Sequence, residues 1–204
     1  MTPLPMFPLG NVVFPFTAVP LRVFEERYQA LLDRVLAGDR RFGIVLIERG
    51  FEVGGGDVRF DTGTLCEVLA VEDLDGGHRA VVVAGMQPLR VTRWLDDDPH
   101  PWAEAEPIQI SGLPGRSRIE EAARELERVL TLASELGADV FSGLDLEVAD
   151  DPVAAAFQLA ALAPSTPLDH QRLLEANDVP TMVEMLIDIL GEQSELLQIR
   201  LAGG

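Results

Sequence analysis

Apolar residues and prolines are interleaved at the front of the chain, between Met6 and Val23. Pro8, Pro15 and Pro20 fall inside this run. Each proline fixes its own φ, removes a backbone N–H donor and pushes the preceding residue into an extended conformation. The run is hydrophobic enough for a core, but it cannot form a helix. We therefore predict short extended pieces joined by corners.

Helical spacing replaces this pattern at Phe24. Apolar side chains then recur at intervals of three and four residues, which places them on one face of an amphipathic helix. Gly38 follows the last of them and is predicted to stop the helix. The residues of this face are Phe24, Tyr28, Leu31, Leu32, Val35 and Leu36.

The pattern from there to about residue 110 is typical of strands. Residues 42–47 are continuously apolar, which indicates a strand buried on both faces. The turn signal Asp75-Gly76-Gly77 separates two apolar runs that are predicted to pair as a hairpin. The expected strands include residues 42–47, 64–71, 79–84, 89–94 and 102–106. This half is predicted to be a small, strongly curved β-sheet or open barrel with one inserted helix.

The segment Ser111-Gly112-Leu113-Pro114-Gly115 breaks the strand pattern, and helical periodicity follows it. An apolar stripe between Ile119 and Leu136 precedes Gly137, which is predicted to end the first of these helices. We therefore expect a β-rich subdomain over residues 1–110, a linker at about 111–115 and a helical subdomain over 116–204. The fold class is α+β.

Two further helices are predicted from the residues at their N-termini. Asp151 precedes Pro152, and Thr166 precedes Pro167; a short polar residue followed by proline is typical of a helix N-terminus. The helix after Thr166 is predicted to be short and to end near Asn177. A final apolar stripe from Met182 to Leu201 completes a predicted bundle of four helices.

Charge narrows the range of partners. The formal net charge is −18, and such a chain repels nucleic acid and anionic membranes while suiting cationic or apolar partners. The single cysteine, Cys66, excludes an internal disulfide and fits a reducing compartment. No basic residue precedes Arg22, so a secretory signal is not expected. The apolar run 154–163 is too short to span a bilayer. These features predict a cytoplasmic protein.

The chain contains no lysine, since all sixteen basic residues are arginine. A Walker A phosphate loop requires a lysine that reaches the phosphates, and a Ser-Lys peptidase dyad requires a lysine as its base. Both chemistries are therefore excluded. We predict a protein that is not an enzyme and that holds no cofactor.

The front of the chain resembles the N-terminal substrate-binding domain of Lon proteases. The resemblance rests on Phe7-Pro8-Leu9, Val12-Val13-Phe14-Pro15 and Pro20-Leu21, continued by residues 42–47 and by the segment Gly85-Met86-Gln87-Pro88-Leu89-Arg90-Val91. It implies a PUA-like pseudo-barrel followed by helices. Because the lysine-dependent ATPase and peptidase modules of that family are missing, it also implies a stand-alone, bacterial-type recognition domain.

The residues that could form a catalytic, metal or phosphate site are interpreted as structural residues. Cys66 lies in an apolar strand context and is expected to fill core space. The run from Asp96 to His100 lacks the spacing of a calcium loop and is expected to be a solvated turn, so no metal is predicted. The acids Asp145, Glu147, Asp150 and Asp151 are interpreted in the same way. Residues 54–56 are expected to form a glycine-rich hairpin loop.

The remaining candidates for a site are large apolar side chains. An extended segment with so many of them is expected to leave some exposed as a groove for unfolded polypeptide, although burial is the commoner fate of any one. Phe16 and Phe51 are flanked by turn signals, and Phe14 and Trp102 complete the predicted peptide-binding set.

The leading hypothesis is a non-catalytic polypeptide-binding protein that acts as an adaptor or regulator in protein quality control. Its expected partners are unfolded or tagged polypeptides, a protease, or a second copy in a weak homodimer. One alternative is a small-molecule- or metal-dependent enzyme that uses Asp61, Glu67 or Glu104. Another is a PUA-like RNA-binding module, which would require five arginines to share one face: Arg40, Arg41, Arg49, Arg90 and Arg93.

Overall fold

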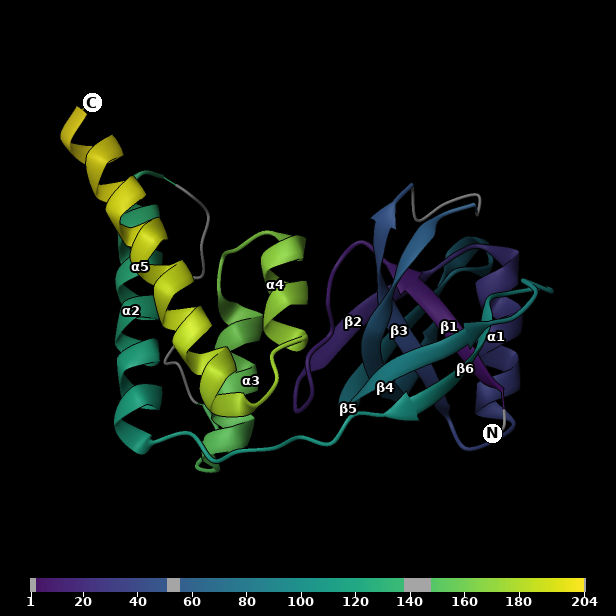
Figure 1. The fold of residues 1–204 in the computed structure, drawn as a ribbon. Coiled ribbons are helices and arrows are strands. Elements are labelled where there is room, and N and C mark those ends of the chain that lie inside the picture. The colour runs from purple at the N-terminus through teal and green to yellow at the C-terminus, as the bar shows by residue number, and fades with distance from the viewer. Residues whose placement is uncertain (1–2, 51–55, 138–147, 204) are drawn as a thin grey trace. The chain divides into compact units, whose positions relative to one another are not determined.

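The structure is a computed structural model that describes residues 3–50, 56–137 and 148–203 (Figure 1). The chain divides into two compact units, Met1–Ile110 and Ser111–Gly204. Each unit is described by itself below.

The N-terminal unit is a curved sheet with one inserted helix. Its described strands follow the order β2-β5-β4-β3-β1-β6, and β6 also pairs with β5. Five strands therefore close into a ring, and β2 is added outside it on β5. The pairing of β1 with β3 is parallel, whereas the other pairings are antiparallel. The strands are β1 (Leu4–Leu9), β2 (Ala18–Val23), β3 (Arg41–Arg49), β4 (Val58–Asp73), β5 (Arg79–Trp94) and β6 (Trp102–Pro107). This ring confirms the predicted pseudo-barrel.

The prolines of the front segment lie where the sheet tolerates them. Pro20 is in β2, which has β5 as its partner in the described sheet, so its missing N–H breaks no ladder on the other side. Pro8 lies in the part of β1 that pairs with β3, where β6 is no longer paired with β1. Between the two strands the chain turns sharply, and the Thr17 hydroxyl donates to the Phe14 carbonyl oxygen at 2.7 Å.

The helix α1 (Glu26–Leu36) begins later than the sequence predicted. Phe24 does not belong to its buried face: Val23 is still paired with Arg79 of β5, and the extended Glu25 is the N-cap, so Phe24 remains outside the helix and is 49% exposed. Of the other predicted residues, Tyr28, Leu31, Leu32 and Val35 are buried as expected, and Leu36 is partly buried. The helix ends at Leu36, and Gly38 donates its N–H to the Val35 carbonyl oxygen at 3.1 Å.

The predicted hairpin is present and longer than expected. β4 and β5 pair antiparallel across a short 3₁₀ turn at Asp75–Gly77. The runs 79–84 and 89–94 are two halves of the continuous strand β5. Gly85 lies between them because a Cβ there would come within 2.1 Å of the Phe14 carbonyl oxygen. Gly63 of β4 similarly allows the Ile44 carbonyl to approach to 2.2 Å from an added Cβ.

A buried apolar cluster joins α1 to the sheet. Phe7 of β1 packs against Tyr28, with ring centres 4.3 Å apart, and against Phe42 at 6.2 Å. Cys66 belongs to the same cluster and is fully buried, and burial raises the pKa of its thiol well above the ordinary range. It is therefore a core residue, as predicted. The cluster also contains Leu31, Leu32, Val35, Ile44, Val68, Val81 and Val83.

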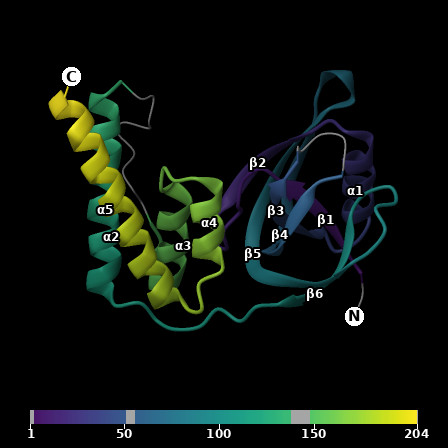
Figure 2. The same ribbon diagram turned by 45° about the horizontal axis from the view of Figure 1, so that its top comes forward.

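The C-terminal unit consists of helices. They are α2 (Arg116–Glu135), α3 (Pro152–Leu162), α4 (Pro167–Leu174) and α5 (Val179–Gly203). Figures 1 and 2 show α2 and α5 side by side, and the Arg118 Nε of α2 donates to Glu184 Oε1 of α5 at 2.7 Å. The buried residues on these two helices include Ala122, Leu126, Val129, Met182, Val183, Leu186 and Leu190.

The helix ends follow the predicted signals with one difference. Asp151 accepts a hydrogen bond from the Ala154 N–H at 2.8 Å, and Thr166 forms a capping box with Asp169. α4 ends at Leu174 and not near Asn177, because Asp178 starts α5 by accepting from the Thr181 N–H at 2.8 Å. None of the described helices is long and apolar enough to cross a membrane.

Candidate functional site

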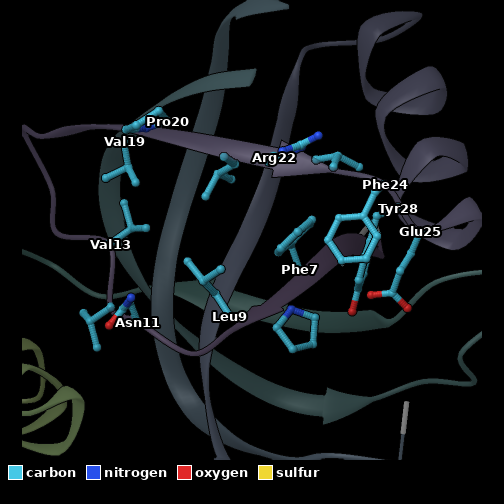
Figure 3. Close-up of a pocket in the computed structure, with 14 residues that line it drawn as sticks. Phe7, Leu9, Asn11, Val13, Val19, Pro20, Arg22, Phe24, Glu25 and Tyr28 are labelled. Atoms are coloured by element: carbon cyan, nitrogen blue, oxygen red, sulfur yellow. The ribbon is translucent and has the colours of Figure 1, made fainter. Parts of the chain in front are cut away.

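A groove opens in the N-terminal unit between β1, β2 and the start of α1 (Figure 3). Its volume is about 400 Å³, near the lower end of the roughly 300–1,000 Å³ typical of ligand pockets. The groove exists because β1 and β2 do not pair with each other, although they follow one another along the chain. The space between them is therefore lined by side chains and strand edges.

The walls of the groove are mostly apolar. Phe7 and Leu9 come from β1, Val13 comes from the connection, and Val19 and Leu21 come from β2. Val13 and Val19 point toward one another in Figure 3. Along β2 the odd-numbered side chains turn inward and the even-numbered ones turn to solvent, as the alternating exposure shows. The arrangement can accept apolar side chains from a partner.

One end of the groove carries polar groups. Tyr28 is 4% exposed, and its hydroxyl has no hydrogen-bond partner in the described part of the chain. Burial raises the pKa of this phenol above its ordinary range, so the hydroxyl stays protonated and can donate as well as accept. The Arg27 guanidinium lies 4.4 Å from the Tyr28 ring centre and also pairs with Glu25 at 3.1 Å.

The outer rim at this end is formed by Phe24 and Arg22. The half-exposed Phe24 ring lies 6.0 Å from the His78 ring, and one Arg22 guanidinium nitrogen lies 3.1 Å from His78 Nδ1. An exposed aromatic ring beside an apolar groove is a common contact for a protein partner.

The predicted peptide-binding residues that the structure describes do not line this groove. Phe14 is only 1% exposed, so its side chain is buried in the core of this structure. Phe16 is 44% exposed at the corner before β2, where its φ of 60° and its bond to the Gly85 carbonyl at 2.8 Å hold it outside the groove lining. Phe51 lies outside the described residues.

Trp102 lies in a different place, on β6. The Arg34 guanidinium is 4.6 Å from its ring centre, and the His100 ring is also 4.6 Å away. The ring borders a shallow depression with Asp96 and Asp98. Trp102 is therefore held between neighbours of its own unit, apart from the lining of the groove.

Sequence reasoning missed most of the groove. Phe7, Leu9, Val19 and Leu21 look like ordinary core residues in the sequence, and only the unpaired arrangement of two consecutive strands brings them to an opening. One signal was available: Pro20 marks β2 as an edge strand. Phe24 lies next to that edge, so it was a better candidate for the groove than Phe16, which lies in the corner before β2.

The acids considered for catalysis are paired in the structure. Asp61 accepts from Trp94 Nε1 at 3.0 Å, Glu67 lies 3.6 Å from Arg41, and Glu104 accepts from Arg93 Nε at 3.2 Å. Within residues 3–50, 56–137 and 148–203 no three His, Cys, Asp or Glu side chains group in a way that could hold a metal ion. Asp145 and Glu147 and most of the loop 54–56 lie outside these residues.

The fold and the site together define an α+β module that presents an apolar groove beside a sheet edge. The sequence profile of the ATP-dependent protease La (LON) substrate-binding domain matches residues 3–192. The chain belongs to this family, as its front segment predicted.

Known proteins that are similar to this chain in sequence include Lon proteases. The Lon protease of Escherichia coli (strain K12) is 28% identical in an alignment of 202 residues that covers 96% of this chain and 25% of that protein. Lon protease 2 of Herpetosiphon aurantiacus is 27% identical in an alignment of 203 residues that covers 96% of this chain and 24% of that protein. The chain thus spans about a quarter of the length of these relatives.

Two solved structures share the fold. The crystal structure of a Lon N-terminal domain protein from Xanthomonas campestris has a TM-score of 0.69 and 25% identity, covering 92% of this chain and 98% of that one. The N-terminal domain of a Mycobacterium avium complex Lon protease has a TM-score of 0.62 and 18% identity, covering 94% and 99%. The latter likeness concerns the fold alone.

Proposed function

We propose that this chain is a non-catalytic polypeptide-binding protein that holds apolar segments in the groove between β1 and β2. The observation that carries this proposal is the open groove itself, with apolar walls and an exposed aromatic rim, in a chain of a substrate-binding family. Binding by apolar side chains requires neither a nucleotide nor a metal. The absence of lysine from the sequence agrees with a role in recognition alone.

The biological setting follows from the same features. An adaptor or regulator in protein quality control would hold unfolded or tagged polypeptides for a protease in the cytoplasm, where the lone buried thiol of Cys66 would remain reduced. The net charge of −18 favours segments that are neutral or basic over acidic ones. A weak homodimer is a further part of this proposal.

The direct test is a titration of the protein against a labelled, permanently unfolded model protein and a labelled apolar peptide. We expect saturable binding that weakens by about tenfold in Phe24→Ala, since truncating an aromatic contact costs on the order of 1–2 kcal/mol. Phe24 is half exposed, so this variant should keep its fold.

The matched control is Leu196→Ala, which removes a 61% exposed apolar side chain from α5 in the other unit. Its binding should equal that of the original protein. The proposal is wrong if neither ligand binds saturably at high micromolar concentration, or if Leu196→Ala weakens binding while Phe24→Ala does not.

A further inference from the structure

The strand β2 has a free edge. In the described sheet it pairs with β5 and no other strand, because it stands at the end of the strand order. The Gly85 N–H donates to the Thr17 carbonyl at 2.9 Å, so Thr17 faces β5. Backbone groups along a strand point alternately to its two sides. Val19 and Leu21 therefore also face β5, while Ala18, Pro20 and Arg22 direct their backbone groups away from it.

This free edge borders the groove, since residues from Val19 to Val23 line it. The edge offers three carbonyl acceptors and two N–H donors, because Pro20 has no N–H. An exposed row of unpaired backbone groups is a template for another strand. The apolar walls next to it would receive every second side chain of that strand.

We infer that the ligand of the groove is an extended peptide that adds to the free edge of β2 as a further strand. This inference rests on the proposed function and specifies the form of its ligand. Alternate side chains of the peptide enter between β1 and β2, and its main chain pairs with Ala18, Pro20 and Arg22. The added strand is an apolar segment with neutral or basic flanks.

The Tyr28 hydroxyl supports a ligand with main-chain polar groups. A buried hydroxyl without a hydrogen bond is unfavourable, and this one lies beside Glu25 at one end of the groove (Figure 3). A peptide carbonyl or N–H at that end supplies the missing partner. A purely apolar ligand would not.

A peptide suits this edge better than a second copy of the chain does. Two β2 strands pairing antiparallel about Pro20 would bring together two residues that both lack an N–H, so central hydrogen bonds would be lost. Two copies that each carry a net charge of −18 also repel one another. A peptide can place an N–H opposite the Pro20 carbonyl and carry a complementary charge.

The test uses a labelled peptide with six central residues, matching the length of β2, in which leucine alternates with threonine between arginine flanks. Two derivatives carry N-methyl groups on the leucines or on the threonines. An added strand turns only one of these sets of N–H groups toward β2. One derivative should therefore bind about tenfold or more weakly, because several main-chain hydrogen bonds are lost, and the other should bind as the parent does.

The outcomes separate the inference from the proposed function. Equal binding of both derivatives overturns strand addition and leaves side-chain recognition in the groove intact. No binding of the parent peptide contradicts the proposed function itself. Dimerisation that competes with the peptide would assign the edge to a second copy and also overturn the inference.

Measurements on the protein provide a second test. Amide hydrogen exchange at Ala18 and Arg22 should slow when the peptide binds, while the amides of Val19 and Leu21, already paired with β5, should change little. Tyr28→Phe should weaken binding of the parent peptide by about threefold to tenfold, which is the effect of one hydrogen bond. The melting temperature of this variant should not fall. Unchanged exchange at Ala18 and Arg22 in the saturated complex would overturn strand addition, and unchanged affinity of Tyr28→Phe would overturn the role of the hydroxyl.

Discussion

Proline has different roles in the two units of this chain. In residues 1–110, Pro8 and Pro20 lie inside strands, at positions that only the final pairing of the sheet makes tolerable. In residues 111–204, Pro152 and Pro167 stand in the first turn of helices, directly after the capping residues. The first unit therefore depends on contacts between distant segments, whereas the second is specified largely by local signals.

The same difference decides where apolar surface can serve binding. In the N-terminal unit, two consecutive strands that fail to pair leave a groove between them. On α5 the exposed apolar residues Leu196 and Ile199 stand on a helix surface. A groove beside a free strand edge provides both shape and hydrogen bonds, and a helix offers only side chains because its backbone is already paired. This contrast favours the first unit as the location of the proposed binding.

The strongest test of the two-unit comparison removes one core leucine from each unit. Leu31→Ala empties part of the cluster under α1, and Leu186→Ala does the same in α5; both side chains are fully buried. Each change should cost about 2–5 kcal/mol. If residues 1–110 and 116–204 fold separately, each variant should lower only its own transition in thermal unfolding followed by calorimetry. A single transition lowered equally by both changes would show that the units unfold together.

A pair of glycine substitutions sharpens the contrast between distant and local contacts. Gly85→Ala should destabilise the first unit by about 3 kcal/mol, because the new Cβ would meet the Phe14 carbonyl at 2.1 Å and the backbone would have to move. Gly191→Ala in α5 meets nothing within 4 Å and should stabilise by about 0.5–1 kcal/mol through helix propensity. Chemical denaturation of both variants measures the difference. Equal effects of the two substitutions would contradict this account.

These differences also explain what the sequence could predict. Asp151 with Pro152 and Thr166 with Pro167 identified helix starts, because capping involves residues next to one another. The curved sheet was predictable from its strand patterns and from the resemblance of the front segment to the Lon family. The groove was not, since the inward positions of Leu9 and Leu21 depend on which strands pair and which do not. The burial of the Phe14 side chain likewise depends on the folded sheet and not on its neighbours in sequence.

Acid should weaken the first unit through one buried ion pair. Arg59 contacts Asp57 at 2.5 Å and Asp97 at 2.6 Å and links the start of β4 to the loop before β6. Burial alone would raise the pKa of Asp57, but the hydrogen bonds and charge of Arg59 outweigh it and hold that pKa below its ordinary value. The stabilisation is thus complete above the unfolded-state pKa of about 3.9 and is lost as the pH falls through the lower folded-state value.

The variant that tests this pair is Asp57→Asn. It should cost about 2 kcal/mol near neutral pH, the value typical of a hydrogen bond to a charged group, and it should make the stability of the first unit less sensitive to pH below about 4. Urea unfolding at a series of pH values measures both effects. An unchanged slope in the acid range would show that Asp57 is not the responsible carboxyl.

The smallest expected effect concerns helix starts. Asp151→Ala removes a side chain that accepts the Ala154 N–H at 2.8 Å, so it should cost about 1 kcal/mol. Glu25 holds the same N-cap position in α1 but makes no capping bond with its side chain. Its pair with Arg27 is worth at most about 1 kcal/mol, and Glu25→Ala should cost less than Asp151→Ala. Urea unfolding of both variants at neutral pH gives the comparison. If Glu25→Ala were the more damaging change, α1 would depend on its own N-terminus and not on the sheet, and the contrast between the units would fail at this point.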